Sequence, residues 1–252
     1  MLKLLIDTVR QSGGAALLDF VSPSFFEVVS VGKSTLLASR LIRDAMLPIP
    51  ADQGALFQRM MDAQKIPVLL DVTKARGNAK STALGGLTLS DEEYGSVILK
   101  LYFSLIFMSQ ESILDLRCQT FSMEDGRLIW RPARVVHQWE VGFIEPMREI
   151  YRGFYSENKK QFRDGLDKLH LGSAEDLFLA HFGTGDQSQV TFTMSGFRKS
   201  FHDIFVHCKA HKIRLHEDFL PLGILLGSLY ENLSHLTVAL NVREAFMSVT
   251  AG

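Results

Sequence analysis

Residues 112–134 constrain the fold most, because they carry the clearest β-strand pattern in a chain whose other long segments are helix-like. Apolar and polar residues alternate over 114–119, which is the period of a half-buried strand. Residues 124–126 (Glu-Asp-Gly) then supply residue types that tolerate the positive φ of a tight turn. Residues 128–130 give a short returning strand, and Pro132 ends it because proline cannot donate to a β-ladder. The stretch therefore predicts one β-hairpin.

The remaining segments predict helices. A Ser-x-x-Glu capping box opens the segment 90–109. Phe197, Phe201 and Phe205 repeat at four-residue spacing, so we expect them on one buried helix face. Residues 67–72 fit a short strand and a buried helix equally well. We predict a mainly α-helical, multi-helix single domain with one central hairpin, and helices over 25–47, 51–65, 90–109, 139–155, 158–169, 173–183, 192–212 and 217–236, with a tail at 241–249 that docks on the body.

Residues 74–89 are rich in glycine, serine, threonine, asparagine and lysine. Such a composition is typical of a loop, because small polar residues bury little apolar surface. We expect this flexible loop to separate an N-terminal helical region, 1–89, from a helical body, 90–252, that carries the 112–134 hairpin.

Composition excludes several classes of protein. The formal net charge of −1 gives no global basic field that would attract nucleic acid. No apolar run reaches the roughly 20 residues that span a bilayer, and no secretory signal pattern opens the chain. Cys118 and Cys208 cannot form a disulfide framework and suit a reducing compartment. We therefore expect a cytoplasmic protein with no transmembrane segment and no nucleic-acid partner.

Residues 32–35 spell Gly-Lys-Ser-Thr, the end of a phosphate-binding loop. The motif also needs a glycine five residues before Gly32, where this chain has Glu27, and a carboxylate there would repel phosphate. The preceding residues are helix-like rather than strand-like. We therefore expect no nucleotide loop here, and we predict no cofactor.

His207 and His211 form the most metal-like pair, because histidines at i and i+4 share one face of a helix. His202 lies nearby in sequence. The glutamate of a His-Glu-x-x-His zinc motif is absent. The competing interpretation is a polar helix end, where Lys209 and its basic neighbours complement the negative end of the helix dipole.

Arginines make the hairpin locally basic, and they form a candidate patch for an anion or an acidic partner. The competing interpretation is a solvated strand face, on which these arginines pair with nearby acids such as Asp115 and Glu124. The candidate residues are Arg117, Arg127, Arg131 and Arg134.

Four segments follow one another along the chain: 94–108 (YGSVILKLYFSLIFM), 124–130 (EDGRLIW), 143–171 and 213–236. Their order and spacing resemble those of the AarF/UbiB family of atypical kinase-like proteins. That family is linked to quinone lipid biology. The first segment is similar to the helix that leads into the family's catalytic loop. The second is similar to the hairpin turn before its metal-binding Asp-Phe-Gly. The last two are similar to its following helical pair and its closing helix. The resemblance implies a remnant of a kinase C-lobe.

The family's catalytic positions are not matched. Its His-Ala-Asp-x-His-Pro-Gly-Asn loop falls on residues 112–119 (SILDLRCQ), which puts Leu114 at the catalytic aspartate and Gln119 at the metal-binding asparagine. Asp115 is one residue out of register. Residues 132–134 (Pro-Ala-Arg) replace Asp-Phe-Gly, so the oxygen ligands that hold Mg²⁺ against phosphates are missing. The resemblance therefore implies a non-catalytic pseudokinase.

Two functions from different classes stay open. The first is a non-catalytic binding or regulatory protein of kinase-like descent, linked to lipid or quinone metabolism, with a protein or lipid partner. The second is a helical enzyme, or a metal- or cofactor-binding protein, that uses His202, His207 and His211. A homodimerisation module is a third alternative. We assign no catalytic residue.

Overall fold

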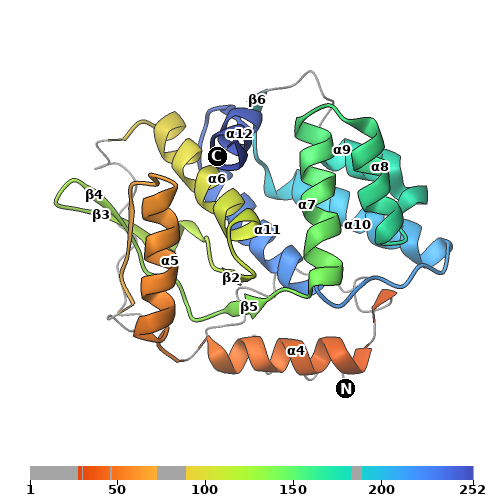
Figure 1. The fold of residues 1–252 in the computed structure, drawn as a ribbon, viewed down its shortest axis with the longest axis horizontal. Coiled ribbons are helices and arrows are strands. Elements are labelled where there is room, and N and C mark those ends of the chain that lie inside the picture. The colour runs from red at the N-terminus through yellow and green to blue at the C-terminus, as the bar shows by residue number, and fades with distance from the viewer. Residues whose placement is uncertain (1–27, 30, 46, 73–88, 183–188, 252) are drawn as a thin grey trace.

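The fold is mainly α-helical, as predicted, and its strands form small sheets of two or three strands (Figure 1). None of the described helices combines the length and the apolar character that crossing a membrane requires. Residues 74–88 of the expected flexible loop lie outside the described residues. The computed structural model describes residues 28–29, 31–45, 47–72, 89–182 and 189–251.

The described helices follow the predicted segments. The capping box at the start of α6 is present, since Ser90 Oγ accepts the Glu93 N–H while the Glu93 carboxylate accepts the Ser90 N–H. Short 3₁₀ turns lie at Cys118–Thr120 and Gly172–Ala174. The α-helices are α4 (Val31–Asp44), α5 (Ala51–Ala63), α6 (Asp91–Phe107), α7 (Val141–Tyr155), α8 (Lys159–Lys168), α9 (Glu175–Phe182), α10 (Met194–Ala210), α11 (Phe219–Leu233) and α12 (Val242–Thr250).

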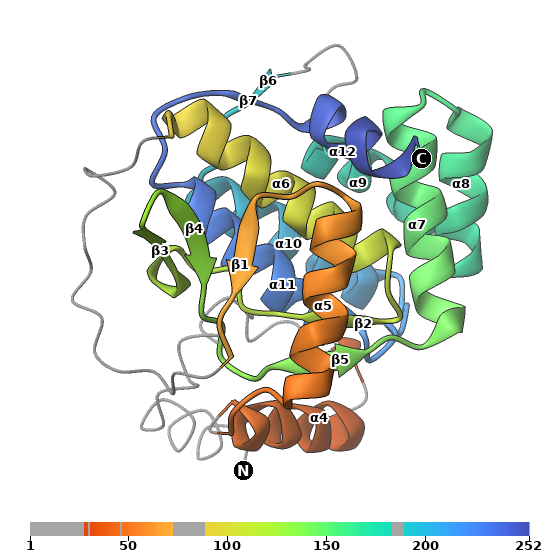
Figure 2. The same cartoon turned by 60° about the vertical axis from the view of Figure 1, so that its left-hand side comes forward.

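Helices α6 and α11 form the centre of the molecule (Figures 1 and 2). Both are apolar on nearly every side, which is typical of helices surrounded by other elements. Helix α5 and the hairpin lie on one side of this centre, and α7 and α8 lie on the other. The C-terminal α12 docks on α6 as expected, because the Phe246 ring packs against Phe103 and Phe107 with centroids 5.3 and 5.5 Å apart.

The predicted hairpin turn is confirmed, since Asp125 and Gly126 both adopt positive φ, at 50° and 74°. Residues 67–72 contain a strand, β1, which pairs in parallel with the second hairpin strand, β4. Residues on both sides of the expected boundary near 89 therefore share one sheet, of order β1-β4-β3. The strands are β1 (Val68–Leu70), β2 (Glu111–Ile113), β3 (Phe121–Glu124), β4 (Arg127–Trp130), β5 (Val136–Gln138), β6 (Gln189–Val190) and β7 (Leu240–Asn241), with β2 pairing β5 and β6 pairing β7.

The first hairpin strand was predicted in the wrong place. It begins at Phe121, and residues 114–120 form an irregular buried segment that ends in a 3₁₀ turn. The expected alternation of buried and exposed side chains is also wrong, because Asp115 and Arg117 are as buried as the neighbouring Leu114 and Leu116. The reason is tertiary: α11 packs along this segment, and the chain after β4 crosses it, so that Asp115 and Arg117 are removed from water.

Candidate functional site

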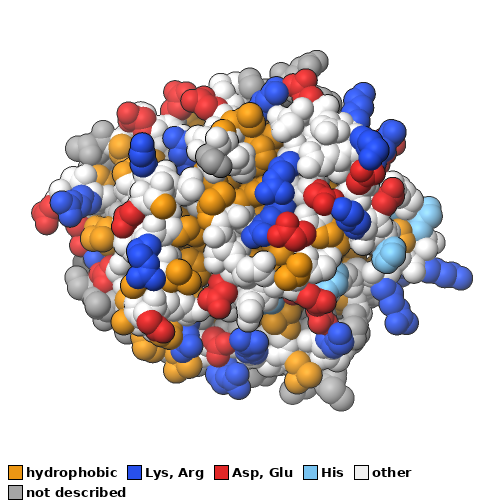
Figure 3. Space-filling view, in the orientation of Figure 1, with side chains coloured by type: hydrophobic (Ala, Val, Ile, Leu, Met, Phe, Trp, Pro, Cys, Tyr) orange, Lys and Arg blue, Asp and Glu red, His pale blue; other side chains and the backbone are white. Residues whose placement is uncertain are grey.

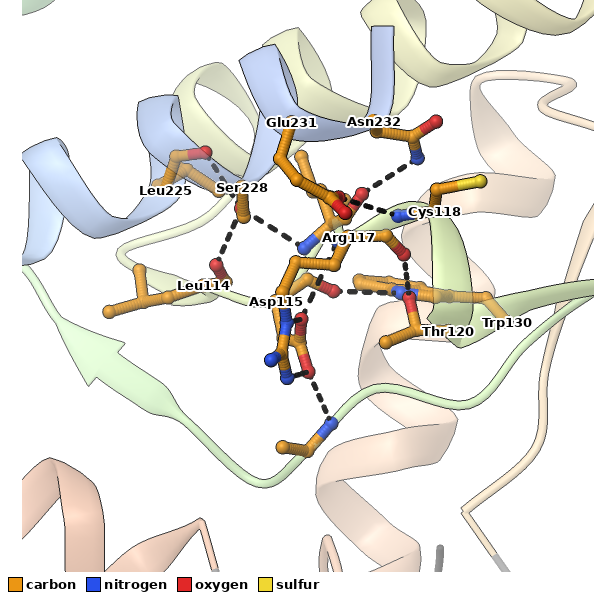
Figure 4. A network of polar contacts seen from close by, with 12 residues as sticks. Leu114, Asp115, Arg117, Cys118, Thr120, Trp130, Leu225, Ser228, Glu231 and Asn232 are labelled. Atoms are coloured by element: carbon orange, nitrogen blue, oxygen red, sulfur yellow. Dashed lines mark hydrogen bonds and ion pairs between the residues drawn. The ribbon is translucent and has the colours of Figure 1, made fainter. Parts of the chain in front are cut away.

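The segment 114–120 is held by side chains of α11 (Figure 4). Ser228 Oγ accepts the Leu116 N–H at 3.1 Å, and Asn232 Nδ2 donates to the Leu116 carbonyl oxygen at 2.7 Å. The Glu231 carboxylate accepts the Cys118 N–H at 3.0 Å. Backbone groups that would otherwise lie buried without partners are thereby satisfied. The segment is therefore a fixed part of the core rather than a mobile loop.

Asp115 and Arg117 form a buried ion pair at the centre of this network (Figure 4). Arg117 Nε donates to Asp115 Oδ1 at 2.7 Å and Arg117 Nη2 donates to Oδ2 at 2.8 Å, while the two residues are 2% and 0% exposed. Burial acts to lower the pKa of Arg117, but the hydrogen bonds and charge of Asp115 outweigh it and the net pKa is raised. Both side chains are paired and removed from water.

The end of the hairpin closes the remaining side of the pair. The Ala133 N–H donates to Asp115 Oδ2 at 2.9 Å, and Trp130 Nε1 donates to the Asp115 carbonyl oxygen at 3.0 Å. The Thr120 hydroxyl donates to the Arg117 carbonyl oxygen at 2.7 Å. Both carboxylate oxygens of Asp115 therefore already accept hydrogen bonds from the protein.

Cys118 lies at the partly exposed end of the segment. Burial and the nearby Glu231 carboxylate raise the pKa of its thiol to about 11. A thiol with so high a pKa stays protonated at neutral pH, and the thiolate is the nucleophilic form. The site therefore offers no reactive cysteine.

The four candidate arginines do not share one surface. Arg117 is buried against Asp115. The guanidinium of Arg131 lies between Glu124 and Asp71, with Arg131 Nε 2.8 Å from the Asp71 carboxylate. Arg127 is exposed on the hairpin and Arg134 is half-buried after it. Arg131 thus matches the interpretation of a strand face with paired charges.

The candidate metal histidines lie at the end of α10. His207 and His211 stack with ring centroids 4.0 Å apart, and His207 Nε2 lies 3.0 Å from Ser173 Oγ. Burial and the neighbouring His211 lower the pKa of His207. His202 is exposed. Within the described part of the chain, no group of three or more histidine, cysteine, aspartate or glutamate side chains is arranged to hold a metal ion.

A second polar site lies in a groove of about 500 Å³ between α4, β5 and the start of α11. There His137 Nε2 lies 2.9 Å from Asp218 Oδ1, and Asp218 Oδ2 accepts the Glu140 N–H at 2.9 Å. Lys33 of α4 pairs with Glu217 at 3.2 Å across the groove. No local motif in the sequence indicates this site, because the two partners are 81 residues apart in the chain.

No protein-family model and no curated protein sequence matches this chain.

Proposed function

We propose that this chain is a non-catalytic binding or regulatory protein of kinase-like descent. The observation that carries the proposal is the state of Asp115, the acid nearest to the catalytic position in the family resemblance. Its carboxylate is fully buried, and it is bound by Arg117 and by the Ala133 N–H. Removing Arg117 from it would leave a buried, unpaired charge, which is strongly unfavourable.

The residues around Asp115 do not fit Mg²⁺ and a nucleotide. A kinase-like site needs carboxylate or amide oxygens that are free to coordinate the metal. A shift of one residue in register would bring Asp115 to the catalytic aspartate and Thr120 to the metal-binding asparagine. The Asp115 oxygens and the Thr120 hydroxyl are already engaged within the protein. Pro132, which has no oxygen in its side chain, stands where the family has the metal-binding aspartate. We derive no phosphoryl-transfer step.

The order of elements supports the kinase-like part of the proposal. Helix α6, the segment 114–120, the β3–β4 hairpin and the α7–α8 pair follow one another as the resemblance requires. Helices α7 and α8 pack closely, since a Cβ at Gly153 would lie 2.3 Å from the backbone nitrogen of Phe162. The link to lipid or quinone metabolism rests on the resemblance alone.

Nucleotide binding tests the proposal. Calorimetry and thermal shift with millimolar ATP or ADP, with and without Mg²⁺, should show no binding and no change in melting temperature. Asp115→Asn and the exposed Asp176→Asn serve as test and control variants. A Mg²⁺-dependent stabilisation that is lost in Asp115→Asn and kept in Asp176→Asn would contradict the proposal and restore a catalytic function.

A further inference from the structure

The outer face of α10 and the turn after it carry an unusual density of positive charge. Between residues 194 and 217 the chain has five lysines and arginines and two acids, although the whole protein has a net charge of −1. Four of its eight histidines also lie there. We call the exposed members the basic ridge; they are Arg198, His202, Lys209, His211, Lys212 and Arg214.

Among the described residues, both acids of this stretch pair with cations that are not members of the ridge. Asp203 pairs with Lys199 at 2.7 Å, and Glu217 pairs with Lys33 of α4 at 3.2 Å. Lysine, arginine and histidine side chains gather at the lower right-hand edge of the molecule in Figure 3, where Figure 1 places the end of α10. A cluster of one sign in a nearly neutral protein creates a local field that attracts anionic partners.

The opposite face of α10 anchors the helix, so the ridge is a surface and not part of the core. Phe197, Ile204, Phe205 and Cys208 are buried. Exposed ridge side chains such as Arg198 and Lys212 can change their contacts without unpacking the helix, in contrast to Arg117.

We infer that the basic ridge binds an acidic segment of a partner protein. The distance from Arg198 to Lys209 along the helix is about 16 Å, at about 1.5 Å per residue. An extended peptide covers that distance with about five residues at about 3.3 Å each. A short run of glutamates or aspartates in one extended conformation therefore spans the ridge members of α10, which are Arg198, His202 and Lys209.

A membrane surface fits this ridge less well. Helices that lie in a membrane interface present a row of large apolar side chains beside their basic residues. Here Val206 is the large apolar side chain exposed on α10, and the phenylalanines of the helix face the protein core. Nucleic-acid surfaces that bind single strands stack bases on exposed aromatic rings, and the ridge has no phenylalanine, tyrosine or tryptophan among its members.

The inference goes beyond the proposed function, because it concerns a surface away from Asp115 and does not depend on nucleotide binding. Its test is fluorescence anisotropy with a labelled peptide of alternating glutamate and serine. The wild-type protein should bind it, and binding should weaken steeply as salt rises from about 50 to about 200 mM. The combined variant Arg198→Glu, Lys209→Glu and Arg214→Glu should bind about tenfold more weakly or worse.

A matched variant controls for total charge. The control combines Arg43→Glu, Arg59→Glu and Lys65→Glu, which change exposed cations of α4, of α5 and of the turn after α5 by the same amount. Binding of the peptide should stay close to wild type. If the glutamate ridge variant fails to fold, the glutamine version of the same three positions replaces it. Equal losses in the ridge and control variants would overturn the inference. Absence of binding, or tighter binding to phosphatidylserine vesicles or to a DNA oligonucleotide than to the peptide, would overturn it as well.

Discussion

The segment 114–120 and the basic ridge both carry charged side chains, but the charges of the segment are buried and those of the ridge are exposed to solvent. In the segment 114–120, Asp115 and Arg117 lie in the core, and their oxygens and nitrogens are matched by hydrogen bonds. On the basic ridge, Arg198 and Arg214 lie in water, where ion pairing contributes little to folding. A buried charge must be paired because its desolvation is costly, whereas an exposed charge has no such requirement.

The contrast separates charges that specify the fold from charges that are available to a partner. Arg117 has one geometry, fixed by Asp115 and the surrounding backbone. A ridge cation such as Arg198 has many rotamers and a hydration shell that a partner can displace. Replacing Arg117 should therefore lower the free energy of unfolding. Replacing Arg198 should weaken the binding of a partner and leave the stability nearly unchanged.

The largest effect is expected for Arg117→Ala. The substitution leaves the Asp115 carboxylate buried without its cation, which should lower the free energy of unfolding by about 3–5 kcal/mol. Urea denaturation followed by circular dichroism measures it. The exposed Arg127→Ala should change stability by less than about 0.5 kcal/mol. A loss below about 1 kcal/mol in Arg117→Ala would mean that the pair contributes no more than a surface ion pair.

The two faces of α10 should differ in the same way, with the inner face contributing to stability and the outer face not. The Phe201 ring is half-buried and packs against Phe197 with a centroid distance of 4.6 Å. Phe201→Ala should cost about 2–3 kcal/mol, somewhat less than a fully buried phenylalanine. Arg198→Ala on the outer face serves as the control. Equal melting temperatures for Phe201→Ala and wild type would show that the ring belongs to a binding surface instead.

A buried and an exposed histidine should contribute differently to the pH dependence of stability. Burial lowers the pKa of His181 to about 4, and its Nδ1 lies 2.8 Å from Ser200 Oγ. In the unfolded chain His181 takes up a proton near pH 6.5, whereas in the folded protein it does so only near pH 4. Stability should therefore fall as the pH drops from about 6.5 to about 4, by about 1–2 kcal/mol after allowance for partial exposure of the ring. His181→Gln should flatten this dependence, while the exposed His202→Gln should leave it unchanged.

The local features of the fold were predictable from the sequence. The capping box at Ser90, the hairpin turn at Asp125-Gly126 and the aromatic inner face of α10 each depend on residues a few positions apart. Phe197 and Phe205 are buried as expected, while Phe201 is only partly so. These predictions succeeded because propensity and periodicity act within one element.

The candidate site was harder to predict, because its environment is built by distant segments. Alternation over 114–119 suggested that Asp115 and Arg117 face water, and nothing local indicates that α11, more than 100 residues later, packs along this segment. The same limit hides the His137–Asp218 pair. A buried polar group reveals its partner only in the folded chain.

The smallest stability effect is expected on the basic ridge itself. Arg214 is exposed in the turn between α10 and α11, and no ion pair joins it to another described residue. Arg214→Ala should therefore change the free energy of unfolding by less than about 0.5 kcal/mol. The same variant should weaken binding of the acidic peptide about two- to fivefold, because one exposed ion pair contributes up to about 1 kcal/mol. Urea denaturation and anisotropy on one protein preparation measure both quantities. A variant that loses stability but keeps peptide affinity would place Arg214 with Arg117 among the charges that specify the fold.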